Sequence, residues 1–235
     1  MRLLVTRPTE GGEHSASILR ARGHEVLLAP LLRIEPIADA DLGASPWSAV
    51  LLSSANAARA IAAHRRMGEL DLLPTVAVGR RTAEVARTMG FADVQSADGD
   101  MRDLIRVAAA RFAGSRAPLL YLAGEVRARE LGKDAAGLEM RTVVVYRAVK
   151  FLSLPASVQT ALNENRLDGV LHFSLRSAEA YVDCAKAAGL LDKALALFHF
   201  CLSTRVAGAL AGAEKVRIAE RPDEAALLEL VGVRQ

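Results

Sequence analysis

The stretch VLLSSANAARA at residues 50–60 returns in weaker form as VLHFSLRSAEA at residues 170–180. At this offset of 120 residues, five of the eleven positions are identical, including Ser54 with Ser174 and Ala58 with Ala178. Each copy starts with the apolar residues of a buried strand, passes through a serine, and continues with helical periodicity. The chain therefore carries the same strand–serine–helix unit twice.

Three further segments also occur twice, in the same order. VGRRTAEVA (78–86) pairs with LSTRVAGAL (202–210), MGFADVQSADGD (89–100) with AGAEKVRIAERPD (211–223), and GHEVLLAPLLRI (23–34) with GLEMRTVVVYRA (137–148). Short runs rich in Val and Leu alternate with helical stretches, which is typical of parallel α/β sheets. The pattern predicts strands near residues 3–6, 25–29, 49–53, 75–78, 93–96, 119–122, 142–146, 169–173, 199–202 and 215–219, and helices at residues such as 14–22, 82–89, 101–112 and 224–231.

Two extended connectors lie at equivalent places in the repeat. RIEPIAD (33–39) and RAVKFLSLP (147–155) each follow a repeated segment and have the alternation and proline of extended chain. We expect the chain to leave a first domain near residue 35, build a second domain, and return near residue 150. Domain 1 is then residues 1–34 and 151–235, and domain 2 is residues 37–147. Each is expected to be a doubly wound parallel sheet of five strands.

The composition excludes several classes of protein. Apolar residues make up 51% of the 235, and 30 basic residues are nearly balanced by 27 acidic ones, without a basic stripe that would suit a nucleic acid. No window approaches the roughly 20 apolar residues of a membrane span, and the N-terminal apolar run is too short for a signal peptide. Two cysteines without a CxxC motif, Cys184 and Cys201, suit a reducing compartment. We expect a cytoplasmic monomer with two buried thiols.

The histidines and glycines do not form a metal or nucleotide motif. The five histidines lack metal-ligand spacing, and His172 and His199 lie in strand-like runs, where satisfied core histidines are expected. TEGGEH at residues 9–14 has neither of the glycine spacings that bind dinucleotides or ATP. We therefore expect no metal and no cofactor.

Small polar residues follow many of the expected strands. In a parallel sheet, ligands bind beyond the carboxyl ends of the strands, where helix N-termini present free N–H groups. The residues at these turns are candidates for substrate binding: Thr6, Arg7, Ser54, Asn56, Gly79, Thr82, Gly124, Ser174, Ser177, Ser203 and Thr204. For any one turn, simple helix capping is an alternative interpretation.

Arginines lie at or beside many of these turns, which capping does not explain. They are Arg7, Arg80, Arg81, Arg127, Arg129, Arg176 and Arg205. A set of N–H donors, hydroxyls and guanidinium groups suits a ligand with many carboxylates.

Several motifs resemble those of the uroporphyrinogen-III synthase family. They are LLVTRP (3–8), LLSSANAARA (51–60), VAVGRRTAEVARTMGF (76–91), LLYLAGEVRARELGKDAAG (119–137) and TVVVYR (142–147). HFSLRSAEAY (172–181) and CLSTRVAGALAG (201–212) resemble the second-half motifs less closely. Where the family often has Ile or Val followed by Gly, and a Thr, this chain has Leu202, Ser203 and Val206, which weakens the case for binding at that turn.

The resemblance implies both a fold and a reaction. The fold would be two flavodoxin-like α/β domains joined by two extended strands, with the active site in the cleft between them. The reaction would be the cofactor-free cyclisation of hydroxymethylbilane, a linear tetrapyrrole with eight carboxylates, to uroporphyrinogen III with inversion of ring D and loss of water.

Tyr146 is the candidate for assisting loss of the hydroxyl. It ends the strand expected at residues 142–146, next to the second connector, and it lies in the VYR motif to which the resemblance assigns this role. A tyrosine is a modest acid, and packing with a solvated hydroxyl is an equally good interpretation of the position. As alternatives for the whole chain, a catalytically degenerate family member or a non-enzymatic two-domain binder of an anionic small molecule stay open.

Overall fold

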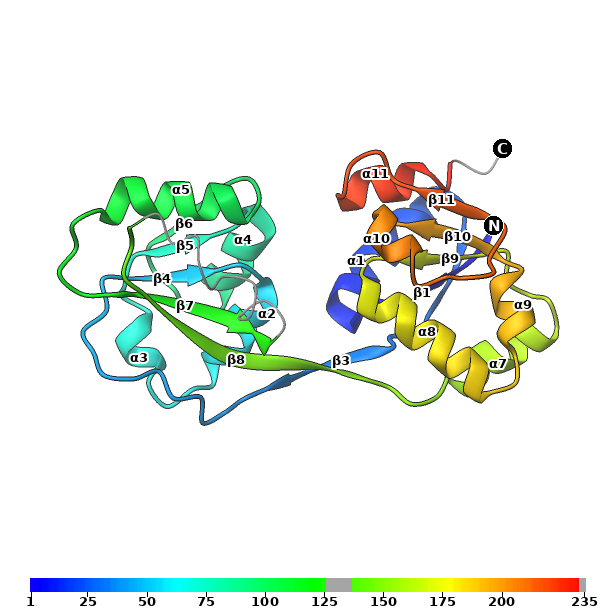
Figure 1. The fold of residues 1–235 in the computed structure, drawn as a ribbon, viewed down its shortest axis with the longest axis horizontal. Coiled ribbons are helices and arrows are strands. Elements are labelled where there is room, and N and C mark those ends of the chain that lie inside the picture. The colour runs from blue at the N-terminus through cyan, green and yellow to red at the C-terminus, as the bar shows by residue number, and fades with distance from the viewer. Residues whose placement is uncertain (126–136, 233–235) are drawn as a thin grey trace. The chain divides into compact units, whose positions relative to one another are not determined.

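The computed structural model describes residues 1–125 and 137–232, apart from the side chains of residues 9 and 10. The chain forms two compact units, of which unit 1 comprises Met1–Arg33 with Val149–Gln235 and unit 2 comprises Ile34–Ala148. The second unit is thus inserted into the first (Figure 1).

Unit 1 is a five-stranded sheet in the order β11-β10-β9-β1-β2, with parallel pairing throughout. Numbered along the chain within the unit, this is the order 2-1-3-4-5 that flavodoxin also has. The elements of unit 1 are β1 (Arg2–Val5), α1 (Thr9–Ala21), β2 (Glu25–Leu28), α7 (Ala156–Asn163), β9 (Gly169–His172), α8 (Leu175–Ala187), α9 (Leu191–Leu195), β10 (Phe198–Cys201), α10 (Thr204–Ala207), β11 (Val216–Ile218) and α11 (Glu224–Glu229).

Unit 2 has a six-stranded sheet in the order β3-β8-β7-β4-β5-β6. Numbered along the chain from β4 to β8, the five strands other than β3 have the order 5-4-1-2-3 across the sheet. β4 therefore lies between β7 and β5, as β9 lies between β1 and β10 in unit 1. The elements are β3 (Leu32–Pro36), β4 (Ala49–Leu52), α2 (Ala55–Ala62), α3 (Met67–Leu70), β5 (Thr75–Ala77), α4 (Arg80–Thr88), β6 (Val94–Ser96), α5 (Met101–Phe112), β7 (Leu119–Gly124) and β8 (Met140–Lys150).

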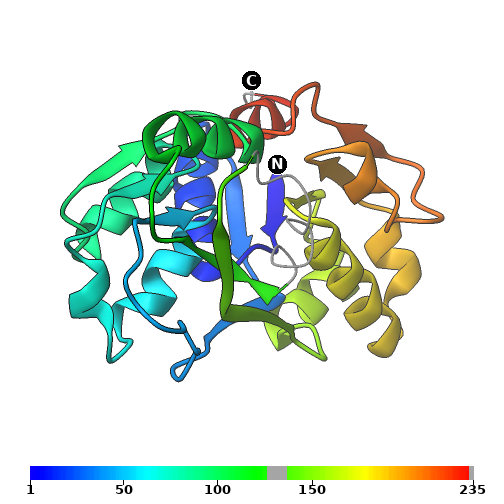
Figure 2. The same ribbon diagram turned by 60° about the vertical axis from the view of Figure 1, so that its left-hand side comes forward.

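Each sheet is covered on both faces, which explains why its central strands are apolar without interruption. In β4, Val50 and Leu52 pack in one cluster with α2, whereas Ala49 and Leu51 pack in another with α5. In unit 1, α7, α8 and α9 cover the face that holds Val170, and α1 and α11 cover the face that holds Leu171 (Figures 1 and 2). Successive strand residues point to opposite faces, so a strand between two helical layers needs apolar residues at every position.

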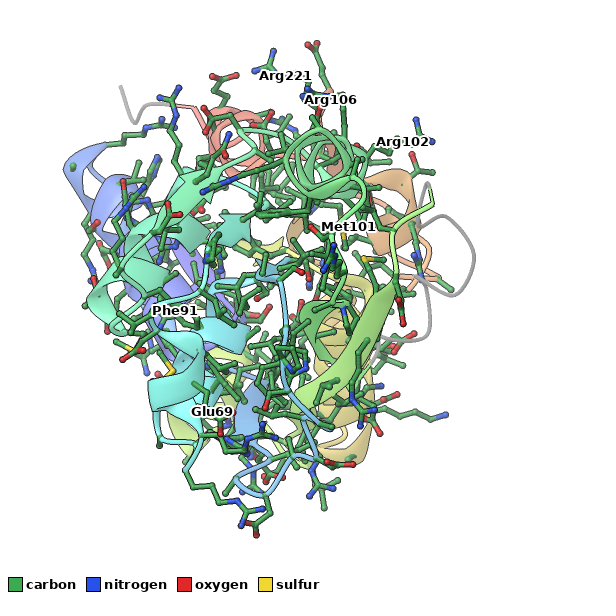
Figure 3. All side chains as sticks on the ribbon, turned by 90° about the vertical axis from the view of Figure 1, so that its left-hand side faces the viewer. Glu69, Phe91, Met101, Arg102, Arg106 and Arg221 are labelled. Carbon is green, nitrogen blue, oxygen red and sulfur yellow. The ribbon has the colours of Figure 1, made fainter. Side chains whose placement is uncertain are left out.

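The surface of unit 2 is charged where its interior is apolar. Arg102 and Arg106 project from the exposed side of α5, and Phe91 is 2% exposed beside Ala86 in the other layer (Figure 3). Arg106 donates to Asp103 one turn earlier, at 3.1 Å. Such exposed pairs contribute little to stability.

Two neighbouring strands, β3 and β8, connect the units. The Phe151 amide donates to the Leu31 carbonyl at 3.0 Å, and the Ile37 amide donates to the Val145 carbonyl at 2.8 Å, so hydrogen bonds lie at both ends of the pair. The residues near 35 and near 150 therefore lie side by side, and the crossing strands satisfy each other's backbone groups.

A mixed α/β fold with parallel sheets is confirmed, but the prediction of five strands in each domain is wrong for unit 2. Its sixth strand is β3, at residues interpreted as connector. β8 is also longer than expected, at 11 residues. The reason is that the connector segments hydrogen-bond to each other and so extend the sheet.

Candidate active site

Both sheets have a point at which the chain order of neighbouring strands reverses. In unit 1 it lies between β1 and β9, and in unit 2 between β7 and β4. Beyond the carboxyl ends of such strands a crevice forms, because the connections leave toward opposite faces of the sheet. At the carboxyl edge of unit 1, Thr6 and Arg7 follow β1 and Ser174 follows β9; at that of unit 2, Ser54 follows β4 and Gly124 ends β7. Residues predicted from the sequence therefore lie at both reversal points.

Ser54 and Ser174 occupy equivalent positions and both cap a helix. Ser54 Oγ accepts a hydrogen bond from the Asn56 amide at 3.2 Å at the start of α2. Ser174 Oγ accepts one from the Ser177 amide at 3.2 Å at the start of α8, and the two hydroxyls are 3.0 Å apart. A capping serine still has its own proton to donate. Ser177 Oγ donates to the Ser174 carbonyl at 2.9 Å, so the Ser174 proton is directed to Ser177 Oγ and would turn to a ligand that accepts it.

Gly79 and Ser203 begin helices without a side-chain cap. Gly79 precedes α4, where Thr82 is 7% exposed in the first turn, and a Cβ added at Gly79 would meet no atom within 4 Å. Ser203 and Thr204 begin α10, which has four residues. The N–H groups at these two helix starts thus have no side-chain acceptor at the cap position.

Tyr146 lies directly against Gly124. The two residues are partners in the β7–β8 register, next to an irregularity at Ala123 and Gly124. A Cβ at Gly124 would lie 2.5 Å from Tyr146 Cζ and 2.7 Å from its hydroxyl oxygen, so a glycine is needed for the phenol to lie there. The ring is 9% exposed and packs in the core of unit 2. Among residues 1–125 and 137–232, no hydrogen-bond partner for its hydroxyl is found.

Thr6 and Arg7 differ sharply in how they are held. Thr6 is fully buried, and its hydroxyl donates to the Leu171 carbonyl at 3.3 Å, across the strands that flank the reversal point. The Arg7 side chain is 23% exposed and lies with Cζ 4.4 Å from the centre of the Phe173 ring. Thr6 thus stabilises the contact between neighbouring strands, whereas part of the Arg7 side chain faces solvent.

The other predicted arginines have separate surroundings. Arg80 Nε is 3.2 Å from Asp98 Oδ1, with its side chain 82% exposed, and Arg205 is exposed in α10. Arg127 and Arg129 lie outside the described residues. The Asn56 side chain accepts a 3.5 Å hydrogen bond from Arg59.

The sequence matches the uroporphyrinogen-III synthase HemD family over residues 13–229. The chain belongs to this family. The family resemblance inferred from the sequence motifs is therefore confirmed.

Solved structures of synthases have the same fold. A uroporphyrinogen-III synthetase from Helicobacter pylori is similar with a TM-score of 0.64 at 18% identity, over 98% of each chain. A mutant uroporphyrinogen III synthase from Thermus thermophilus has a TM-score of 0.50 at 16% identity, over 98% of this chain and 97% of that one. No curated protein matches this chain.

The divergent turn of this synthase-family chain has a structural explanation. Val206, where the family often has threonine, is 4% exposed and packs with Ala178 and Leu210 under α10. Ser203 makes no capping bond. The valine therefore serves the core of unit 1.

Several residues at the carboxyl edges were not predicted from the sequence. Ser53 Oγ lies 2.6 Å from the Tyr121 hydroxyl at the end of β4. Ser15, Phe173 and Glu224 surround Arg7. The paired glycines within the helix that follows LLVTRP were the one available signal for the Arg7 cluster, because glycine is disfavoured inside helices.

His172 and His199 form a buried pair, which was only partly predicted from the sequence. His172 Nε2 and His199 Nδ1 are 3.0 Å apart, both residues are fully buried, and the Tyr181 ring packs against His172 edge-on. Burial lowers the pKa of His172 well below its usual value and also lowers the pKa of His199. The expectation of satisfied core histidines is right for one nitrogen of each ring, while His172 Nδ1 and His199 Nε2 lack partners in the described chain.

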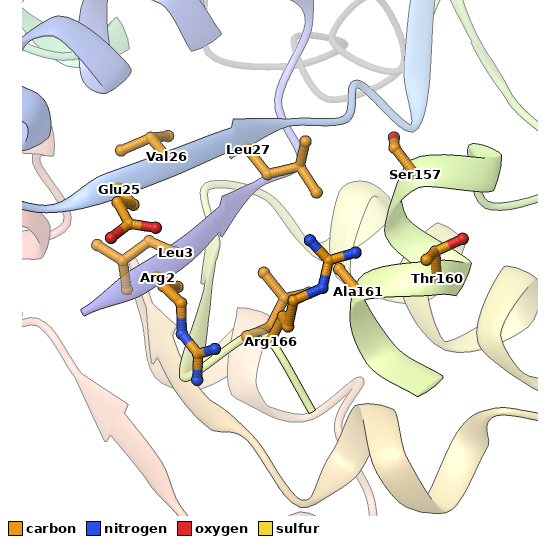
Figure 4. A pocket seen from close by; sticks show the side chains of 10 residues that line it. Arg2, Leu3, Glu25, Val26, Leu27, Ser157, Thr160, Ala161 and Arg166 are labelled. Atoms are coloured by element: carbon orange, nitrogen blue, oxygen red, sulfur yellow. The ribbon is translucent and has the colours of Figure 1, made fainter. Parts of the chain in front are cut away.

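A hollow in unit 1 lies away from these turns. This cavity of about 420 Å³ opens at the amino ends of β1 and β2 (Figure 4). Its two arginines are already paired, Arg2 with Asp168 at 2.8 Å and Arg166 with Glu164 at 2.6 Å. Because ligands of such sheets bind at the opposite edge, this cavity is not assigned to the reaction.

The described parts of the chain contain neither a metal-ligand cluster nor a membrane-spanning helix. Within them, no three His, Cys, Asp or Glu side chains are grouped as metal ligands, and no helix combines the length and apolar character needed to span a bilayer. Cys184 and Cys201 are both free and buried, as predicted.

Proposed function

We propose that this chain closes hydroxymethylbilane to uroporphyrinogen III, inverting ring D and releasing water. The observation that carries the proposal is the family match over residues 13–229. The placement of polar groups at the reversal points of both sheets supports it.

Substrate binding is proposed for the carboxyl edges of both units. Candidate donors are the uncapped helix starts after Gly79 and Ser203, the hydroxyls of Ser54, Ser174 and Thr204, and the Arg7 guanidinium. Carboxylates bind well to N–H groups at helix N-termini and to guanidinium groups. A substrate with eight carboxylates needs many such donors.

Tyr146 is proposed as the group that assists loss of the hydroxyl. As the C–O bond breaks, its phenol O–H would pass its proton to the hydroxyl oxygen of the bilane. Water then leaves, the azafulvene cation remains, and the phenol becomes a phenolate. The azafulvene cation that forms is stabilised within the pyrrole, so a modest acid suffices. Two observations support this role: the described residues offer the Tyr146 hydroxyl no hydrogen-bond partner, and the ring has a fixed position against Gly124.

The inversion of ring D requires control of shape. The bilane closes by itself to the symmetric isomer I, whereas isomer III requires the substituted carbon of ring D to attack and give a spiro intermediate. Holding reactants in such a geometry can supply a large part of a barrier. We propose that the bound carboxylates fold the bilane into this geometry.

The test is a coupled assay in which the purified chain receives freshly made hydroxymethylbilane and isomers I and III are separated. We expect isomer III in excess, with a rate proportional to protein concentration. Isomer I alone, at the spontaneous rate, would refute the proposal. Binding of uroporphyrin III without turnover would instead identify a non-catalytic binder of anionic small molecules, or a degenerate family member.

A further inference from the structure

Arg7 is held by groups from three other parts of unit 1. Its Nη1 lies 3.0 Å from Glu224 Oε1, at the start of α11, and donates to Ser15 Oγ of α1 at 3.1 Å. Ser15 Oγ donates to the same Glu224 oxygen at 2.6 Å, so one ion pair and two hydrogen bonds form a closed triangle. The Phe173 ring packs against the guanidinium from beyond β9. An arginine with this many contacts has lost most of its rotamer freedom.

Gly11 provides the space that the Arg7 guanidinium occupies. A Cβ placed on Gly11 would lie 2.6 Å from Arg7 Nε, 2.8 Å from Cζ and 2.9 Å from Nη2, so the guanidinium occupies the space of a side chain. Gly11 is inside α1, where glycine is unfavourable relative to alanine. Its backbone has no positive φ that would otherwise call for glycine. The space needed by Arg7 is therefore the physical reason for a glycine at this position.

The guanidinium keeps binding capacity after these contacts. Nη1 makes the ion pair with Glu224 and the hydrogen bond to Ser15, and no described side chain or carbonyl accepts from Nε or Nη2. The side chain is 23% exposed at the reversal point, one strand from the capping Ser174. An arginine can bind a carboxylate through two N–H groups at once.

We propose that Glu224 and Gly11 are positioning elements that fix Arg7 to bind one carboxylate of the substrate. This inference rests on the proposed function. Glu224 also places a negative charge beside the site, which by itself opposes an anionic ligand. A guanidinium that is already fixed loses little conformational entropy when it binds a ligand. We infer that this preorganisation of Arg7 outweighs the repulsion of the ligand by Glu224.

Glu224 has two opposing effects on substrate binding, and the direction in which KM changes when it is replaced shows which effect is larger. Glu224→Gln removes the negative charge but also weakens the hold on Arg7. If charge dominates, KM for hydroxymethylbilane falls; if positioning dominates, KM rises. We expect a rise of about tenfold with kcat within about twofold, the size of one charged hydrogen bond. Glu224→Asp, which keeps the carboxylate, should restore part of the affinity.

Gly11→Ala displaces the guanidinium without touching any charge. We expect KM to rise about tenfold while the melting temperature changes little, because the helix propensity gained with alanine offsets the loss of the partly exposed ion pair with Glu224. In an Arg7→Ala background, Gly11→Ala should change KM less than about twofold, since the displaced group is gone. Gly68→Ala is the matched control, because its added Cβ meets no atom within 4 Å.

The outcomes separate this inference from the proposed function. If the wild type makes isomer III but KM is unchanged in Gly11→Ala, or falls in Glu224→Gln, the inference is wrong and the function stands. If the wild type makes no isomer III, the function is wrong, and the same variants are titrated with uroporphyrin III. A tenfold higher Kd for uroporphyrin III in both Glu224→Gln and Gly11→Ala then supports the inference. An unchanged Kd in these variants, or no binding by the wild type, overturns it.

Discussion

Adding one methyl group at Gly124 tests the role of Tyr146 from the side of its neighbour. In Gly124→Ala the new Cβ would lie 2.5–2.8 Å from three atoms of the phenol, Cζ, Oη and Cε2. Carbon atoms in contact are normally about 3.5 Å apart or more, so the ring must move by roughly 1 Å. The hydroxyl of Tyr146 moves with it.

The magnitude follows from this displacement. A misplacement of about 1 Å at a reacting group can cost roughly 100-fold in rate, so we expect kcat to fall about 100-fold. Overpacking at Gly124 should cost about 1–3 kcal/mol of unfolding free energy. Tyr146→Phe, which removes only the hydroxyl, should lower kcat by roughly 10- to 1000-fold, the range of one general acid, and change the unfolding free energy by less than about 1 kcal/mol, because the hydroxyl has no partner in the described chain.

The assay measures isomer III formation at saturating hydroxymethylbilane for both single variants and the double variant. If the methyl acts through Tyr146, Gly124→Ala in the Tyr146→Phe background should lower kcat by no more than about threefold. The product that remains should still be mainly isomer III. Activity of Tyr146→Phe within twofold of wild type would refute the role of the hydroxyl, and mostly isomer I would show that Tyr146 positions ring D.

Three other predictions concern unit 1. Burial lowers the pKa values of His172 and His199 and so keeps both neutral in the folded chain. Below the ordinary histidine pKa of 6.5 the unfolded chain therefore binds more protons than the folded chain, and the melting temperature should fall as pH drops below about 6.5. His172→Leu should flatten this dependence, because it removes one of the two buried imidazoles, and an equally steep curve would contradict it. Ser174→Ala removes a helix cap and should cost about 1 kcal/mol in thermal unfolding but lower kcat less than Tyr146→Phe; a loss as large would give the hydroxyl a catalytic role. Burial raises the pKa of Cys201 to about 12, so its thiol should react with a disulfide reagent only after unfolding, and rapid labelling of the native protein would show that it is accessible.

The residues that could be predicted at the candidate site are those whose role is local. Ser54 and Ser174 cap the helices that follow them within two or three residues, so a serine between a strand and a helix was sufficient evidence. Gly124 and Tyr146 were each singled out, yet their contact depends on the register of β7 and β8 and on the irregularity at Ala123. No local pattern encodes that register.

The class of fold and the positions of ten strands could be predicted from the residues alone, because burial between two helical layers requires uninterrupted apolar runs in the central strands. The sequence also revealed the repeat, since equivalent strands such as β4 and β9 need equivalent residues. Three features could not be predicted and became visible only in the folded chain: the pairing of β3 with β8, the His172–His199 contact, and the contacts of Glu224 and Gly11 with Arg7. Most of these contacts join residues far apart in the chain, and they depend on strand order and register, which are set by the packing of the whole unit and leave no periodic signal around either partner.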